Sequence, residues 1–194
     1  MTRASVYELT LSNSQRGWCA ISDLHLSEHM PETMAKFEWF CAHIAPQYDA
    51  LFILGDLFEY WVGDDAADFN PAALRVIDAI HTLKSRGTQS YFMRGNRDFL
   101  VGADFLARCG VHDLADPTAL SFQQHACLLT HGDLLCTDDV AYQQFRRQVR
   151  TPEWQAAFLA RPLAERQAMA RQIQVGGEHL LLEDLEVHAG TPRL

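Results

Sequence analysis

Four short apolar runs punctuate the first two thirds of the chain: WCAIS from Trp18, LFIL from Leu51, YFM from Tyr91 and CLLT from Cys127. Runs of this length that are separated by longer amphipathic stretches are typical of strands buried in a parallel sheet. We therefore expect four parallel strands, at 18–22, 51–54, 90–93 and 125–130, and an α/β fold.

The stretches between these runs have apolar residues at helical spacing. One helix is predicted from Pro31 to about Pro46 and a second from Pro71 to Gly87, because proline is favoured in the first turn and glycine just beyond the last. A short third helix through Phe105 should end at Gly110. The polar segment 1–17 is expected to be an N-terminal extension with at most one edge strand, through Val6, Tyr7 and Leu9.

The segment from Val140 to Gln172 differs in character from the rest of the chain. Its pattern predicts a long helical stretch with a break near Arg161–Pro162. It carries six arginines against two acidic residues, although the formal charge of the whole chain is -9. The positive charge is therefore local to this segment.

Composition narrows the class of protein. With 194 residues and 48% hydrophobic content, the chain can bury one full core. The acidic balance argues against nucleic-acid binding.

The five cysteines form no CxxC pair and are expected to be mostly buried, reduced thiols of a cytoplasmic protein. No basic and apolar leader opens the chain, and no run approaches the ~20 apolar residues of a membrane span. We expect a soluble or peripheral protein.

Each apolar run is followed by residues that can bind a metal ion. Asp23 and His25 follow the first run, Asp56 the second, Asn96 the third and His131 the fourth. The carboxyl ends of parallel strands meet at one edge of a sheet, where open α/β sheets place their sites. Each residue alone is also common in turns and helix caps, but the ordered set D-x-H, G-D, G-N-x-D and H-G-D favours a metal site.

The chemistry of these side chains suggests two ions rather than one. Asp23 and His25 lie two residues apart, so they point the same way from an extended segment. A carboxylate can bridge two cations held about 3.5–4 Å apart, and Asp56 is the candidate bridge. Asn96 and His131 would complete the second ion. Mixed oxygen and nitrogen ligands leave manganese, iron and zinc open.

Four blocks of the chain resemble the calcineurin-like metallophosphoesterase superfamily: DLHL from Asp23, GDLFEYWVGDD from Gly55, GNRDFL from Gly95 and HGD from His131. The resemblance implies a layered β-sandwich flanked by helices, with a core at 18–139 and a helical cap inserted at 140–172. It also implies two divalent metal ions, usually Mn²⁺. One ion would be bound by Asp23, His25 and Asp56, and the other by Asp56, Asn96 and His131.

Longer stretches, LFILGDLFEYWVGDD, YFMRGNRDFLVG and LLTHGDLLCTDDVAYQQFRRQVR, resemble a narrower branch of that superfamily. Its members cleave the pyrophosphate of a UDP-linked diacylated glucosamine lipid in lipid A biosynthesis, as peripheral proteins on the cytoplasmic face of the inner membrane. This resemblance implies that Asn96, Arg97 and Asp139 contact substrate. Asp98 and Asp133 are candidates to orient the ligands, although surface or turn roles fit the sequence equally. No obligate protein partner is expected.

Arg97 stands where many relatives in the superfamily have a histidine that protonates an alkoxide leaving group. A guanidinium stays charged and cannot do this. A phosphoanhydride releases a phosphate ester of low pKa, for which a fixed positive charge is sufficient. Catalytic roles are therefore assigned to Asp56 and Arg97, and the substitution favours a diphosphate substrate. A solvent-exposed arginine, or one paired with Asp98, is the alternative.

The pattern breaks after Arg171. The superfamily's G-H-x-H block, which supplies one more histidine to each ion, is absent from the printed sequence, and the last strands of the sheet are expected to be incomplete. Segment 173–194 is a divergent tail whose His179 and His188 are expected at the surface. We predict five of seven ligands, weak metal retention and little turnover. A dinuclear enzyme acting on nucleotides or other small diphosphates, and an inactive metal-binding remnant, are the alternatives.

Overall fold

The computed structural model describes residues 6–11 and 15–176. The chain divides into two compact units between Asp133 and Leu134, and each is treated by itself below. The limits expected from the sequence at 17, 139 and 172 stay predictions. His179, His188 and nearly all of the expected tail at 173–194 lie outside the described residues.

A four-stranded parallel sheet forms the centre of the first unit. Its strands are β2 (Trp18–Ile21), β3 (Ala50–Leu54), β4 (Gln89–Met93) and β5 (His112–Leu114), in the order β2-β3-β4-β5. The first three correspond to the first three apolar runs, and their prediction is confirmed. The short strand β5 was not predicted. It has three residues, two of which are exposed, so it contains no apolar run that the sequence could reveal.

A second sheet contains β1 (Tyr7–Leu11), β6 (Thr118–Phe122) and β7 (His125–Leu129), in the order β1-β6-β7. The expected edge strand near Val6 is β1, which pairs in parallel with β6. The prediction that 125–130 is a fourth buried parallel strand is wrong. β7 runs antiparallel to β6, and its first four residues are exposed. Only Gln123 and Gln124 connect the two strands, and so short a connection requires an antiparallel pair.

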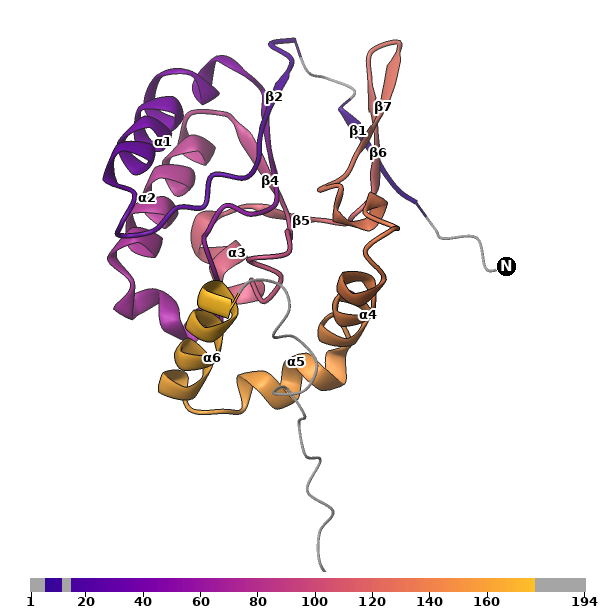
Figure 1. The fold of residues 1–194 in the computed structure, drawn as a ribbon. Coiled ribbons are helices and arrows are strands. Elements are labelled where there is room, and N and C mark those ends of the chain that lie inside the picture. Colours follow the sequence, from indigo (N-terminus) through magenta and orange to yellow (C-terminus); the bar gives the residue numbers. More distant parts are fainter. Residues whose placement is uncertain (1–5, 12–14, 177–194) are drawn as a thin grey trace, which may run out of the picture. The chain divides into compact units, whose positions relative to one another are not determined.

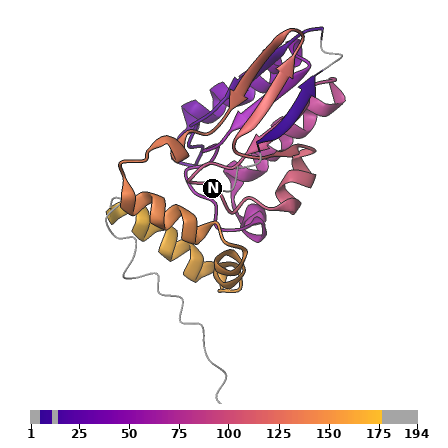
Figure 2. The same cartoon turned by 90° about the vertical axis from the view of Figure 1, so that its right-hand side faces the viewer.

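The two sheets face one another across an apolar core. Side chains at alternate positions of β3 and β4, including Phe52, Tyr91 and Met93, pack with Leu120 of β6 and Leu129 of β7. Phe52 stacks on Tyr91 with ring centroids 5.0 Å apart. Figure 1 shows the two sheets side by side, and Figure 2 turns the β1-β6-β7 sheet toward the viewer. The layered sandwich expected from the resemblance is confirmed.

Helices cover the other face of the parallel sheet (Figure 1). They are α1 (Pro31–His43), α2 (Pro71–Ser85) and α3 (Ala103–Cys109), with the 3₁₀ turns η1 (Ala45–Gln47) and η2 (Asp64–Phe69). Phe92 of β4 lies edge-on to Phe105 of α3, on the opposite side of β4 from Tyr91. The three predicted helices are confirmed, and Gly110 ends α3 in the left-handed conformation, as expected.

The second unit is helical and contains α4 (Val140–Val149), α5 (Pro152–Leu159) and α6 (Leu163–Gly176). A 3₁₀ turn, η3 (Asp133–Leu135), lies at the division between the units. The predicted break near Arg161–Pro162 separates α5 from α6. A second break, after Arg150, was not predicted. There Thr151 caps α5 by accepting a hydrogen bond from the Trp154 amide, and Pro152 occupies the first helical position.

The cysteines only partly match the expectation that most are buried. Cys41 and Cys109 are buried and Cys19 is half-buried, whereas Cys127 and Cys136 are exposed, and all five are free thiols. Cys127 is exposed because β7 lies at the edge of its sheet. Within the described part of the chain, no helix is both long and apolar enough to span a bilayer.

Candidate metal centre

The segments that follow β2 and β3 continue side by side beyond the ends of the strands. The backbone N–H of Asp23 donates to the carbonyl of Gly55 at 3.1 Å, and that of His25 donates to the carbonyl of Asp56 at 3.0 Å. The amide of Leu26 then donates to Leu57 at 2.8 Å. These backbone bonds fix the relative positions of three candidate ligands: Asp23, His25 and Asp56.

The backbone of these ligands is strained. Among the described residues other than glycine, four have a positive φ, namely Asp23 at 54°, His25 at 49°, Asp56 at 52° and the hairpin residue Gln123 at 52°. This left-handed conformation is uncommon for residues with a side chain and costs on the order of 1 kcal/mol each. Such strain persists where surrounding contacts enforce it, and it concentrates at functional sites.

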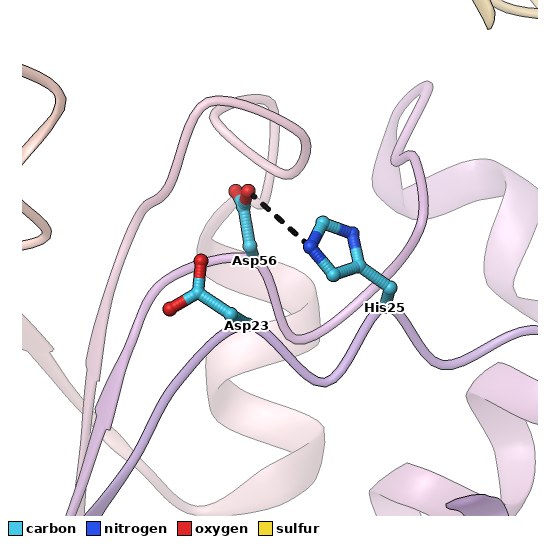
Figure 3. Close-up of side chains that lie close together, drawn as sticks. All are labelled: Asp23, His25 and Asp56. Carbon is cyan, nitrogen blue, oxygen red and sulfur yellow. Dashed lines mark ion pairs between the residues drawn. The ribbon is translucent and has the colours of Figure 1, made fainter.

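The side chains of Asp23, His25 and Asp56 converge (Figure 3). One ligand atom from each lies within 4.8 Å of the other two. The Nε2 atom of His25 is 3.9 Å from Oδ2 of Asp56. Asp56 is buried and Asp23 is exposed, so the cluster is held from the interior and open toward solvent. Two carboxylates and an imidazole at this spacing can coordinate one divalent cation.

The other carboxylate oxygen of Asp56 faces a second group of donors. The Nε2 atom of His131 lies 3.7 Å from Oδ1 of Asp56 and 2.9 Å from Oδ1 of Asn96. The Nδ1 atom of His131 lies 2.9 Å from the carbonyl of Leu54. Since a carbonyl can only accept, Nδ1 carries a hydrogen, and in the neutral ring Nε2 then presents its lone pair. Oxygen atoms of Asp56 and Asn96 both lie near Nε2 in this form, so a cation beside it would be bound by all three atoms.

Asp56 therefore stands between two half-sites, with Oδ2 toward His25 and Oδ1 toward His131. The structure brings together all five side chains that the sequence analysis selected as ligands: Asp23, His25, Asp56, Asn96 and His131. His131 arrives from the antiparallel strand β7 of the second sheet, rather than from a fourth strand of the parallel sheet. The donor set fits two divalent cations that share the Asp56 carboxylate.

Two glycines allow the loops to approach this closely. A Cβ atom on Gly55, which has a φ of +91°, would lie 2.6 Å from the Cα of Gly95 and 2.6 Å from Nδ1 of His131. A Cβ atom on Gly95 would collide with the carboxylate and backbone nitrogen of Asp56. Any side chain at either position would displace a ligand.

Asp98 joins the loops after β3 and β4. Its completely buried carboxylate accepts hydrogen bonds from the amides of Gly95 at 2.8 Å, Leu57 at 2.8 Å and Asp56 at 3.3 Å. Burial raises the pKa of Asp98 to about 6, and the Asp56 carboxylate raises it too, while hydrogen bonds from the amides of Gly95, Leu57 and Phe58 counteract the shift. Asp98 holds the backbone that carries the ligands.

Asp116 was not selected from the sequence. Its Oδ1 accepts a hydrogen bond from the hydroxyl of Thr130 at 2.7 Å and from the amide of His131 at 3.3 Å. The hydroxyl of Thr130 in turn accepts from the amide of Gly132 at 3.1 Å. These bonds fix the loop that presents His131. The sequence offers no signal for this role, because Asp116 precedes Pro117 and looks like an ordinary turn residue.

The remaining selected residues occupy different environments. Arg97 comes directly after the candidate ligand Asn96 in the sequence. Its backbone N–H donates a hydrogen bond to Oδ1 of Asp56 at 2.8 Å. Asp133 is buried at the end of the first unit. Asp139 lies in the second unit, where its carboxylate caps α4 by accepting from the Tyr142 amide at 2.9 Å. The expected substrate contacts of Asn96, Arg97 and Asp139 stay predictions.

Comparison with a family model identifies the class of protein. Residues 19–184 match the model of the calcineurin-like phosphoesterase family. The chain belongs to this family, whose fold and donor set were expected from the four sequence blocks.

Among curated relatives, the chain is similar to proteins named UDP-2,3-diacylglucosamine hydrolase. It is 52% identical over 152 residues to the one from Stenotrophomonas maltophilia (strain R551-3), a match that covers 78% of this chain and 60% of the relative. It is 49% identical over 158 residues to the one from Aromatoleum aromaticum, a match that covers 81% of this chain and 64% of that relative. The one from Chromobacterium violaceum is 50% identical over 158 residues, a match that covers 81% of this chain and 65% of that relative. The matches therefore span less than two thirds of these relatives' length.

Proposed function

We propose that this chain carries the dinuclear metal site of an enzyme that hydrolyses the pyrophosphate bond of UDP-2,3-diacylglucosamine, releasing UMP and 2,3-diacylglucosamine 1-phosphate. The observation that carries the proposal is the position of Asp56, whose two carboxylate oxygens face His25 on one side and His131 on the other. The names of relatives near 50% identity support the choice of substrate.

Asp23, His25 and Asp56 would hold one cation, and Asp56, Asn96 and His131 the other. We propose Mn²⁺, although the donor set also accommodates iron or zinc. When bound, a pair of divalent cations activates water and neutralises charge on the phosphoryl oxygens. The buried Asp56 keeps its position through the Arg97 amide and the Asp98 hydrogen bonds, so the ligands are organised before any cation arrives.

Arg97 would stabilise the phosphate that leaves. Two hydrogen bonds hold its backbone, because its amide donates to Asp56 and its carbonyl accepts from the Trp61 amide at 3.1 Å. A guanidinium that stays charged at any working pH suits a leaving group that needs no proton. Asn96 and Asp139 are proposed as further substrate contacts.

We also propose that the protein works as a peripheral protein on the cytoplasmic face of the inner membrane. The proposed substrate is a lipid, and α4 carries Arg146 and Arg147 near its C-terminal end. Exposed apolar side chains precede and begin this helix, with Leu135 at 73% and Val140 at 61% exposure. Basic and apolar groups together suit an anionic lipid surface.

The test is release of UMP from UDP-2,3-diacylglucosamine by the purified chain in the presence of Mn²⁺. UDP-N-acetylglucosamine, which has the pyrophosphate but no long acyl chains, is the comparison substrate. We expect Mn²⁺-dependent release from the lipid that the Asp56→Asn variant lacks. Equal release by the wild-type chain and Asp56→Asn would overturn the proposal. Faster cleavage of the soluble substrate would favour a small-diphosphate hydrolase.

A further inference from the structure

The imidazole of His25 lies between two carboxylates. Its Nε2 atom faces Asp56, and its Nδ1 atom lies 3.3 Å from Oε2 of Glu59. The Nδ1 atom is shielded from solvent and makes no hydrogen bond within the described residues. Glu59 is thus the anion beside a nitrogen that needs an acceptor. The sequence analysis gave Glu59 no role, although it lies within the block GDLFEYWVGDD.

The backbone places Glu59 opposite His25. The amide of Glu59 donates to the carbonyl of Leu26 at 3.3 Å, and the amide of Leu26 donates to Leu57 at 2.8 Å. Leu26 and Phe58 form an isolated parallel bridge. This short ladder starts one residue after His25 and ends at Glu59, so main-chain pairing sets their separation.

The two histidines of the site are supported differently. His131 donates from Nδ1 to the neutral carbonyl of Leu54, whereas His25 faces a carboxylate. We propose that Glu59 is a positioning residue for the cation bound by Asp23, His25 and Asp56. As the anion beside Nδ1, Glu59 favours a hydrogen on that nitrogen, which keeps the Nε2 lone pair directed at Asp56 and makes this histidine a stronger ligand. The inference rests on the proposed two-cation site. It implies that the histidine ligands of the two cations have different partners, a carboxylate for His25 and a carbonyl for His131.

The first test uses the metal-free protein. Long-range ¹H–¹⁵N spectra above pH 8 report which nitrogen of each neutral histidine carries the hydrogen. We expect His25 to carry it on Nδ1 in the wild-type chain and in Glu59→Gln, whose amide oxygen can still accept. Glu59→Leu should shift the hydrogen toward Nε2 and leave His131 unchanged. Glu28→Gln is the matched control, because Glu28 is an exposed carboxylate three residues from His25. The same His25 tautomer in wild type and Glu59→Leu would overturn the proposal.

The second test is a Mn²⁺ titration followed by electron paramagnetic resonance. Glu59→Leu should weaken one of the two sites about 10–100-fold, which is typical when the partner of a metal-binding histidine is lost. The other site should be unaffected, and Glu59→Gln should lie between wild type and Glu59→Leu. Equal weakening of both sites, or of neither, would contradict a role specific to His25. If the wild-type chain bound no Mn²⁺, the proposed two-cation site would fail, while the tautomer measurement would still decide the role of Glu59.

Discussion

Asp98 accepts a hydrogen bond from the backbone amide of Asp56, the residue that stands between the two halves of the site. The same carboxylate accepts from Gly95 and Leu57, so one buried side chain joins the loop after β3 to the loop after β4. The geometry of the metal centre therefore depends on a residue that need not touch a cation.

Replacing Asp98 with asparagine should loosen this connection. The NH₂ group of the amide must face a backbone donor, either Gly95 or Leu57, and each buried donor left unsatisfied costs ~1–3 kcal/mol. Removing the buried charge offsets part of this loss, so we expect a net decrease of about 1–3 kcal/mol in the free energy of unfolding. Urea denaturation of the metal-free protein measures it. Asp78→Asn, on the exposed face of α2, is the control, and equal effects of both variants would show that Asp98 is not a structural connection.

Gly55 offers a test of the close approach of the loops. Gly55→Ala combines an unfavourable φ of +91° with contacts of 2.6 Å to Gly95 and His131. Gly17 has a similar φ of +77°, but nothing lies within 4 Å of its Cβ position. Gly17→Ala should lower the free energy of unfolding by the cost of the positive φ alone, ~1–2 kcal/mol. Gly55→Ala should lower it by a further ~1–3 kcal/mol because of overpacking. Gly55→Ala should also lower the affinity for Mn²⁺, as isothermal titration would show. A Gly55→Ala variant that matches Gly17→Ala in both measurements would contradict the steric argument.

The sequence predicted the part of the fold that depends on local pattern. The runs that became β2, β3 and β4 are continuously apolar because both faces of their sheet are covered, so they stood out clearly. Asp23, His25, Asp56 and Asn96 were identified because they follow these runs directly. The helices were predicted from Pro31, Pro71 and Gly110, whose backbone preferences mark helix ends.

The sequence did not reveal the direction of one strand or the contacts between residues that are far apart along the chain. An apolar run has no polarity of its own, so β7 was assigned to the parallel sheet although the two-residue turn at Gln123 makes it antiparallel. His131 was still selected correctly, because the loop held by Asp116 carries it to Asp56 from the second sheet. Asp116 and Glu59 were missed, since each acts on a residue at least 15 positions away in sequence.

The cysteines should differ in reactivity according to burial. Burial raises the pKa of Cys41 to about 12 and that of Cys109 to about 12, and the pKa of Cys19 to about 11. At pH 8 these thiols stay protonated and are poor nucleophiles, whereas the exposed Cys127 and Cys136 should be alkylated rapidly. Mass spectrometry after brief iodoacetamide treatment should find two modified cysteines in the folded protein. Five should be modified after denaturation. Rapid native modification of Cys41 or Cys109 would contradict the packing of α1 or α3.

Cation binding should stabilise the folded chain. A ligand that binds only the folded state at 100 times its Kd contributes ~2.7 kcal/mol, which for a chain of this size corresponds to roughly 5–10 °C in Tm. We expect such a rise with excess Mn²⁺, its reversal by a chelator, and no rise for Asp56→Asn. A wild-type Tm that stays unchanged with excess Mn²⁺ would contradict cation binding to the folded chain.

Arg97 allows the proposed chemistry to be separated from binding. Its backbone makes the bonds to Asp56 and Trp61, so Arg97→Ala should keep the fold and the cation affinity. If the guanidinium stabilises charge on the departing phosphate, kcat should fall by roughly 10²–10³, with a much smaller change in KM. Arg97→Lys should recover part of the rate, because the ammonium is positive but lacks the planar fork. Lys36→Ala removes one exposed positive charge from α1 and should change neither constant. A rise in KM at unchanged kcat would instead assign Arg97 to ground-state binding of the diphosphate.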